Sequence, residues 1–204
     1  MPRASSVAPR LTRFFDPRFQ RESVKLMPGE HYASGEDLVI STVLGSCVAA
    51  CLWDEVRGVG GMNHFMLPDS GANGFDLYGA SGRYGVYAME LLINALLKLG
   101  AHRQRLQAKV FGGASVLETL AHADVGERNA EFVAGFLATE RIPLIAQDLL
   151  GTWPRRVCLF PATGRVLMRR LAGHADAALI DVERDYRKRV TATPPAAAGG
   201  IELF

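Results

Sequence analysis

Residues 37–68 read DLVISTVLGSCVAACLWDEVRGVGGMNHFMLP, and this stretch decides the fold class. Its first run, 37–42, is apolar and rich in β-branched residues, which is typical of a strand. Two more strand-like runs, 47–54 and 59–68, are separated by the turn sequence EVRG and predict a β-hairpin. We therefore expect the domain to build part of a β-sheet before its first helix.

The rest of the chain mixes helical and strand patterns. Apolar residues from Val86 to Leu97 recur at helical spacing up to Gly100, and a second helix is predicted over 130–141, before Pro143. The other predicted elements are strands at 107–113, 143–150, 156–161 and 164–171 and a charged helix at 177–190. Consecutive strands mixed with helices favour the α+β class over a regular alternation of strands and helices.

The two ends of the chain differ in composition from the part between them. Residues 1–34 carry arginines among prolines and serines without an apolar period, which predicts a basic, partly ordered arm. Residues 191–204 consist mostly of Pro, Ala and Gly before a final IELF, which predicts a flexible tail. One domain is expected between them, over residues 35–190.

Composition and charge exclude several classes of protein. The formal net charge is only +2, from 23 basic and 21 acidic side chains, so nucleic acid is not an expected partner. No apolar run approaches the roughly 20 residues of a membrane-spanning helix, and the N-terminus lacks the pattern of a secretory signal, so no membrane insertion is expected. Three cysteines, an odd and sparse set, fit a cytoplasmic protein with free thiols.

One thiol and one imidazole are the candidate catalytic pair. Cys47 follows Gly45 and Ser46 at a predicted tight turn, where backbone N–H groups can point at a common spot and hold an oxyanion. His64 lies on the facing strand of the hairpin, close enough to favour the nucleophilic thiolate of Cys47. A hydroxyl from Ser41 or Thr42 could orient the ring, but neighbours in a strand face opposite sides, so only one of them can.

The same residues have simpler interpretations. A cysteine of this kind is more often a buried structural residue, and Cys51, with Cys47 and His64, lacks a fourth zinc ligand at recognisable spacing. We therefore expect no metal and no cofactor. FGGAS, at 111–115, lacks the lysine of a phosphate-binding loop and is expected to form a tight reversal near the site. The charged run 183–189 is expected to be a solvated helix face.

Four segments carry a resemblance to a known family. STVLGSCVAACLWD at 41–54, GGMNHFMLPDS at 60–70, RYGVYAMELLINALLKLGA at 83–101 and KVFGGAS at 109–115 resemble the CheD family of chemoreceptor glutamine deamidases. The similarity runs from about residue 29 to residue 190. It implies a layered α/β sandwich with mixed sheets flanked by helices, as in cytotoxic necrotizing factor toxins, and a Cys–His–Thr catalytic set.

The resemblance assigns roles to residues of this chain. Cys47 and His64 match the family's nucleophile and base, and Ser41 stands six residues before the cysteine, where we expect the family's threonine. The implied activity is hydrolysis of glutamine side chains on the cytoplasmic domain of methyl-accepting chemotaxis receptors, through a cysteine thioester. A CheC-like phosphatase is a further candidate partner. The alternatives are a receptor- or CheC-binding module with little catalysis, or a thiol-dependent receptor methylesterase.

Overall fold

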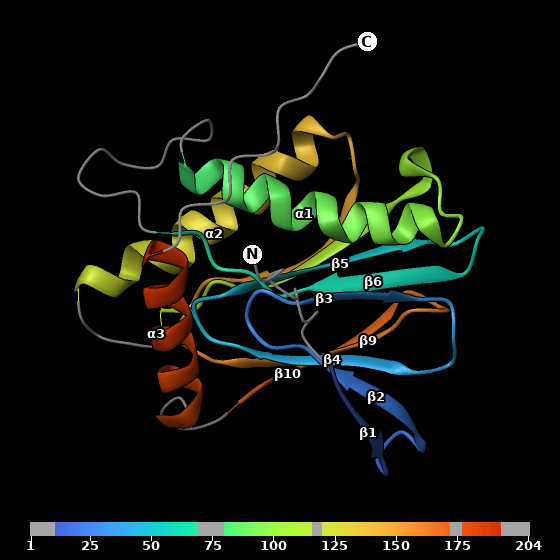
Figure 1. Cartoon of the computed structure of the whole chain (residues 1–204), viewed down its shortest axis with the longest axis horizontal. Helices are drawn as coiled ribbons and strands as arrows, with labels where there is room; N and C mark the ends of the chain where they lie inside the picture. Colours follow the sequence, from blue (N-terminus) through green and yellow to red (C-terminus); the bar gives the residue numbers. More distant parts are fainter. Residues whose placement is uncertain (1–10, 69–79, 116–119, 172–176, 193–204) are drawn as a thin grey trace, which may run out of the picture.

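Two sheets and three α-helices make up the described parts of the chain. The computed structural model describes residues 11–68, 80–115, 120–171 and 177–192 (Figure 1). Within these ranges the strands form two five-stranded sheets. The predicted loop from Asp69 onward, the first ten residues of the predicted arm and most of the predicted tail lie outside the described residues.

The first sheet has the strand order β1-β2-β4-β9-β10. Its strands are β1 (Thr12–Asp16), β2 (Arg21–Lys25), β4 (Val39–Leu44), β9 (Arg155–Phe160) and β10 (Arg165–Arg170). Strand β2 pairs with β4 in parallel, whereas the other neighbours are antiparallel. This sheet is therefore mixed, and β4, which precedes the candidate nucleophile, lies at its centre.

The second sheet has the strand order β3-β6-β5-β7-β8. Its strands are β3 (His31–Ser34), β6 (Val59–Asn63), β5 (Val48–Asp54), β7 (Gln107–Gly112) and β8 (Leu144–Leu149). Strands β5 and β6 form the predicted hairpin, and the only parallel pair among these described strands is β7 with β8. The chain thus passes from the first sheet to the second between β4 and β5, at Gly45–Cys47.

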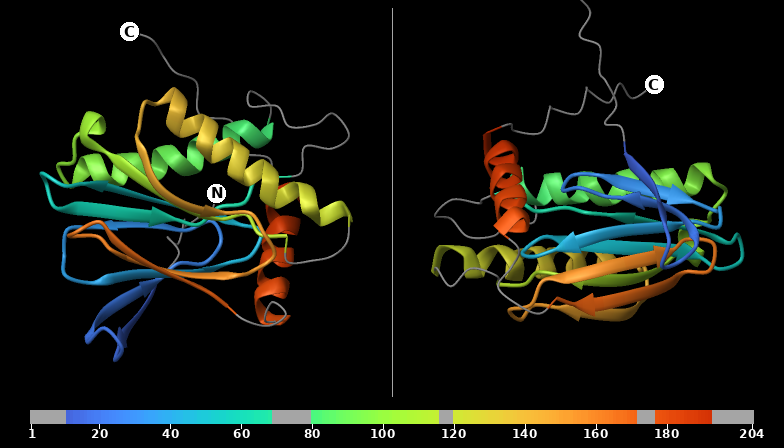
Figure 2. Two further views of the ribbon diagram at one scale, coloured as in Figure 1. Left: turned by 180° about the vertical axis from the view of Figure 1, so that it is seen from behind. Right: turned by 90° about the horizontal axis from the view of Figure 1, so that it is seen from below.

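The elements stack in layers (Figure 2). Helices α1 (Ala80–Lys98) and α2 (Leu120–Thr139) cover one face of the second sheet, and the first sheet covers its other face. Alternation along β5 divides its side chains between two cores: Val48, Ala50 and Leu52 pack with the helices, while Ala49 and Cys51 pack between the sheets. The α+β class and the layered sandwich of mixed sheets are therefore confirmed.

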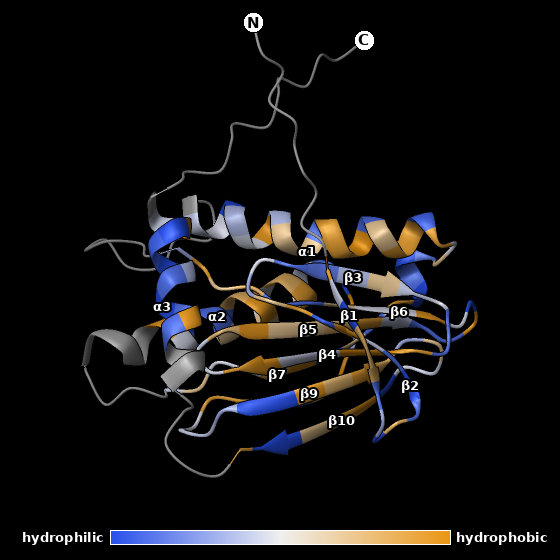
Figure 3. Cartoon of the chain, turned by 60° about the horizontal axis from the view of Figure 1, so that its bottom comes forward, coloured by the Kyte–Doolittle hydropathy of each residue, from blue (hydrophilic) through white to orange (hydrophobic). Residues whose placement is uncertain are grey.

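Helix α3 (Ala177–Ala192) stands apart from this stack. It runs across the ends of the two sheets (Figures 1 and 2), and Figure 3 shows that it is largely hydrophilic, unlike α1. Its position and extent agree with the charged last helix predicted at 177–190. None of the helices in the described ranges combines the length and the apolar character that a bilayer crossing requires.

Helix α2 begins earlier than the pattern predicted. It starts at Leu120 instead of residue 130. Its first half contains Gly126, which weakens a helical prediction from sequence. In the structure this glycine allows close packing, because a Cβ atom at Gly126 would come within 2.4 Å of the carbonyl oxygen of Gly113. The close approach to Gly113 therefore explains Gly126, which the local helical pattern disfavours.

The segment predicted to be an arm contains three strands. Residues 12–34 contain β1, β2 and β3, of which β2 pairs with β4 in the first sheet and β3 pairs with β6 in the second. The predicted boundary at residue 35 therefore falls inside the sheets. The sequence lacked a clear apolar alternation here because β1 is mostly exposed and β3 is short and half-buried at the edge of its sheet.

Candidate active site

Cys47 lies in the turn that crosses between the two sheets. Its side chain is fully buried. The FGGAS segment supports this turn: Gly113 N–H donates to the Cys47 carbonyl and Ala114 N–H to the Gly45 carbonyl, both at 2.8 Å. Gly112 has a φ of +116°, and a Cβ atom there would lie 2.2 Å from the Cys47 carbonyl oxygen. As predicted, these glycines make a tight reversal beside the candidate nucleophile.

His64 follows β6 and faces the same space as Cys47. Val48 and Phe65 exchange two backbone hydrogen bonds, of 3.0 and 2.9 Å, which extend the hairpin beyond β6. Because successive residues face opposite sides of a strand, this register directs both Cys47 and His64 toward the first sheet. The Sγ atom of Cys47 and a ring nitrogen of His64 lie within 4.8 Å of each other. The structure thus brings together the predicted pair.

Thr42 supplies the hydroxyl that holds the imidazole. Its Oγ1 atom lies 2.8 Å from His64 Nδ1 and donates to the Leu26 carbonyl at 2.9 Å. A hydroxyl has a single proton to donate, so Thr42 must accept from Nδ1–H. The neutral ring therefore carries its proton on Nδ1, and Nε2, which has no hydrogen-bond partner among the described residues, is left as the base.

The assignment of this role to Ser41 was wrong. Ser41 lies on the opposite face of β4, where its hydroxyl is 3.4 Å from that of Ser23 and is partly exposed. Ile40, Thr42 and Leu44 are the side chains of β4 that point between the sheets. The alternative that alternation left open, Thr42, is the residue in contact with His64. The threonine of this chain thus stands five residues before the cysteine.

A carboxylate from α3 completes the site, and the sequence analysis missed it. Glu183, only 5% exposed, accepts hydrogen bonds from the backbone N–H groups of Gly45, Ser46 and Cys47 at 2.8, 2.9 and 3.3 Å. The Ser46 hydroxyl donates to it as well, at 2.8 Å. The predicted convergence of N–H groups at this turn is therefore present, and an anion already occupies it. The burial of Glu183 contradicts the prediction that residues 183–189 form a wholly solvated helix face.

The burial of these groups sets their charge. Burial raises the pKa of the Cys47 thiol well above its ordinary value, and the Glu183 carboxylate beside it raises that pKa further. Burial also lowers the pKa of His64 to about 4, against an opposing effect of Glu183. In the described arrangement both members of the pair are therefore neutral at pH 7. The sequence predicted that His64 favours the thiolate of Cys47, and the desolvated site with its bound carboxylate does not do so in this arrangement.

A buried asparagine ties the turn to the segment after His64. Asn129 of α2 is fully buried, donates from Nδ2 to the Ser46 carbonyl at 2.9 Å, and accepts from the Leu67 N–H at 2.8 Å. Both backbone groups would otherwise lack a partner in a dry interior. Asn129 therefore fixes the separation between the turn of Cys47 and the segment that follows His64.

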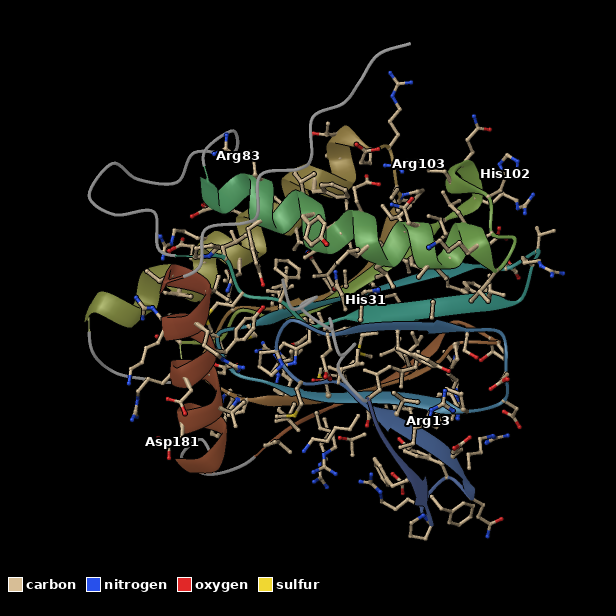
Figure 4. All side chains as sticks on the ribbon, viewed as in Figure 1. Arg13, His31, Arg83, His102, Arg103 and Asp181 are labelled. Atoms are coloured by element: carbon tan, nitrogen blue, oxygen red, sulfur yellow. The ribbon has the colours of Figure 1, made fainter. Side chains whose placement is uncertain are left out.

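Two tyrosines lie between α1 and α3 next to the site. The hydroxyl groups of Tyr84 and Tyr186 are hydrogen bonded to each other. Arg83, the neighbour of Tyr84, is exposed and points away from the sheets (Figure 4). The contact of Tyr84 with α3 shows that the start of α1 borders the site, while Arg83 does not reach it.

The other histidines differ in exposure. His102 is exposed, whereas His31 is half-buried in β3 and lines a small cavity of about 60 Å³ with His64 and Tyr84. The side chains of His122 and His174 lie outside the described residues.

The three groups at the centre are also of types that bind zinc. Donor atoms of Cys47, His64 and Glu183 lie within 4.8 Å of one another. The Glu183 oxygens, however, are already used as acceptors for three N–H groups. Cys51 is not part of this group of described residues and instead packs between the sheets. The contacts present thus occupy the Glu183 oxygens within the protein, whereas His64 Nε2 has no partner among the described residues.

A buried thiol next to an imidazole, with a hydroxyl that fixes the ring, is the arrangement of hydrolases that use a cysteine nucleophile. The family model for CheD, described as chemotactic sensory transduction, matches residues 66–170. The chain belongs to the CheD family.

Curated relatives cover nearly the whole chain. It is 54% identical over 192 residues to the probable chemoreceptor glutamine deamidase CheD 1 of Dechloromonas aromatica, with 94% of each chain covered. It is 52% identical to the corresponding Herminiimonas arsenicoxydans protein, covering 94% of this chain and 93% of the relative. The crystal structure of the Bacillus licheniformis hypothetical protein YfiH overlaps 59% of this chain and 51% of its own, with a TM-score of 0.37 and 14% identity, a likeness too weak to carry an argument.

Proposed function

We propose that this chain is a chemoreceptor glutamine deamidase. It would hydrolyse selected glutamine side chains of methyl-accepting chemotaxis receptors to glutamate and release ammonia. The names of relatives that are 54% and 52% identical support the reaction and the substrate. The observation that carries the proposal on this chain itself is the contact of Thr42 with His64 Nδ1, because it leaves Nε2 as the free base of a ring that has a nitrogen within 4.8 Å of Cys47 Sγ.

The first half of the reaction forms a thioester. His64 Nε2 takes the thiol proton, and the sulfur of Cys47 attacks the carbon of the glutamine carboxamide. The negative charge that develops on the amide oxygen is stabilised by backbone N–H groups of the Gly45–Cys47 turn. The protonated His64 then donates its proton to the departing nitrogen, the C–N bond breaks, and ammonia leaves.

The second half returns the enzyme to its starting state. His64 removes a proton from a water molecule that attacks the thioester carbon, the C–S bond breaks, and the proton returns to the sulfur. The product on the receptor is a glutamate. Thr42 contributes by holding the ring in the tautomer that both halves need.

The test is mass spectrometry of a purified receptor cytoplasmic fragment incubated with the protein. Site-specific conversion of glutamine to glutamate by the wild type, and none by Cys47→Ala, is the expected result. If the fragment is bound but unchanged with several receptors, the catalytic proposal fails and the chain is a binding module.

The same proposal places the protein in the cytoplasm, because the modified glutamines would lie on the cytoplasmic part of the receptor. A CheC-like phosphatase is the second partner that we propose. Binding of purified CheC from the same cell to this chain, measured by calorimetry, tests that pairing, and an absence of heat with folded proteins would remove it.

A further inference from the structure

The backbone N–H groups of residues 45–47 form an N–H cradle, and the carboxylate that occupies it belongs to this chain. Glu183 reaches it from α3, and the sequence separates it from Cys47 by 136 positions. Its carboxylate receives three backbone N–H groups and one hydroxyl, a complete set of donors for an anion. Buried carboxylates are costly unless hydrogen-bond donors satisfy them, and these four donors satisfy Glu183.

Glu183 has the chemical form of the reaction product. A deamidated receptor residue is a glutamate side chain, and here a glutamate lies with a carboxylate oxygen within 4.8 Å of Cys47 Sγ and a His64 ring nitrogen. The same N–H groups that hold its oxygens are those that would stabilise the oxyanion of a bound carboxamide. The side chain is also presented by a helix. A glutamine on another helix would therefore reach the same atoms through an identical pair of methylene groups.

Few residues of α3 are buried against the rest of the domain. Glu183, Tyr186 and Val190 recur at helical spacing and are the buried residues among 181–191, whereas Arg184, Asp185 and Lys188 on the remaining surface are exposed. Figure 4 shows Asp181 on the outer side of the helix. Apart from Glu183, the described hydrogen bond from this face to the rest of the site joins Tyr186 to Tyr84. These three residues form a short buried stripe by which α3 packs against the domain.

Occupation by Glu183 is incompatible with catalysis. The carboxylate fills the cradle that the substrate carboxamide needs, and its charge opposes formation of the Cys47 thiolate. A substrate must therefore displace Glu183 before Cys47 can react.

We propose that α3 is a product-like occupant of the substrate site, so that the surface beneath it binds the glutamine-bearing helix of the substrate, which has to displace α3. This inference rests on the proposed deamidase function and adds the form of the substrate and a regulatory contact. The geometry predicts that the site takes a glutamine presented on a helix, with small or apolar residues three and seven positions later, where Tyr186 and Val190 lie on α3.

The test replaces the product-like glutamate of α3 with a glutamine, the residue type of the substrate. In the full-length Glu183→Gln protein, the Cys47 sulfur attacks the new carboxamide, ammonia leaves with a proton from His64, and water hydrolyses the thioester. The expected result is glutamate at position 183 in the purified variant, detected by peptide mass spectrometry. The double variant with Cys47→Ala, and a Glu131→Gln variant on the exposed face of α2, are expected to keep their glutamine.

A second measurement covers the case of a variant that does not fold. A synthetic peptide of residues 177–192 with glutamine at 183 is added to the wild-type protein, and we expect it to be deamidated by the wild type and not by Cys47→Ala. If the variant and the peptide both keep their glutamine while the wild type converts a receptor fragment, the inference is overturned and the deamidase function stands. If the receptor fragment is unchanged too, the proposed function fails and the inference with it.

Discussion

The Oγ1 atom of Thr42 lies 2.8 Å from Nδ1 of His64, and this contact joins the two sheets at the site. Thr42 belongs to β4 of the first sheet, whereas His64 follows β6 of the second. The nucleophile lies in the turn between β4 and β5. The catalytic geometry therefore depends on how the sheets are packed, and a change on one sheet alters the ring held by the other.

Replacing Thr42 by valine should impair the reaction without unfolding the protein. Valine keeps the shape but cannot accept from Nδ1–H, so the tautomer with a free Nε2 loses its support. Valine removes two buried hydrogen bonds, one with His64 Nδ1 and one to the Leu26 carbonyl. Loss of the bond to the ring lowers kcat by about tenfold to a hundredfold. The matched control is Ser41→Ala on the opposite face of β4, which should leave kcat unchanged. Rates of receptor deamidation would contradict the assignment if Ser41→Ala were the slower variant.

The pH dependence of Cys47 reactivity should report the presence of Glu183. Burial and the adjacent carboxylate raise the Cys47 pKa, so in the wild type the thiolate forms only at a pH well above the ordinary range of a free thiol. Removing the carboxylate in Glu183→Ala lowers that pKa, and the profile of iodoacetamide labelling shifts to lower pH. Peptide mass spectrometry separates Cys47 from Cys51, whose pKa is raised to about 12 by burial and whose labelling should not change.

Asp185→Ala is the control for that experiment, because Asp185 is exposed on the same helix and does not contact the site. Its labelling profile should match that of the wild type. Coincident profiles for Glu183→Ala and the wild type would show that the carboxylate does not govern the thiol.

The proximity of Cys47 and His64 could be predicted from sequence because both belong to one local unit, the β5–β6 hairpin and its extensions, whereas their roles were inferred from the resemblance to the CheD family. The choice between Ser41 and Thr42 could not, since both faces of β4 are apolar: Val39 lies on one and Ile40 on the other. Alternation showed that only one hydroxyl could reach the ring, without saying which.

The contact of Glu183 with the active site could not be predicted from its local sequence, for a different reason. A charged helix is usually solvated, and nothing near residue 183 in the sequence indicates an N–H cradle formed by residues 45–47. One signal was available: Glu183, Tyr186 and Val190 recur at the spacing of a buried face within an otherwise charged helix. Strands β1 and β3 were missed because exposed or half-buried edge strands lack the alternation that reveals a strand. Strand β2 was missed because its two buried residues are adjacent and do not alternate with exposed ones.

Asn129 should be important for stability. Asn129→Ala leaves the Leu67 N–H and the Ser46 carbonyl without partners, and each unsatisfied buried group costs about 1–3 kcal/mol. Urea unfolding is the measurement. Asn129→Asp, which keeps the acceptor for Leu67 but cannot donate to Ser46 when ionised, should also destabilise. Glu131→Ala on the exposed face of the same helix should change the free energy of unfolding by less than about 0.5 kcal/mol.

Gly112 and Gly135 make a matched pair for the last prediction. A Cβ atom at Gly112 would lie 2.2 Å from the Cys47 carbonyl oxygen, and its φ of +116° disfavours any other residue. Gly112→Ala therefore has to displace the turn that carries the nucleophile, and we expect loss of receptor deamidation together with a lower melting temperature. Gly135 in α2 has open space at its Cβ position.

Gly135→Ala should keep full activity and raise stability by about 0.5–1 kcal/mol, because alanine loses less backbone entropy in a helix interior than glycine does. Comparing the two variants separates a specific effect on the Cys47 turn from a general effect of replacing glycine. If Gly112→Ala retained the wild-type rate of receptor deamidation, the turn would tolerate movement of the Cys47 backbone. The close contact between Gly112 and Cys47 would then have no role in catalysis.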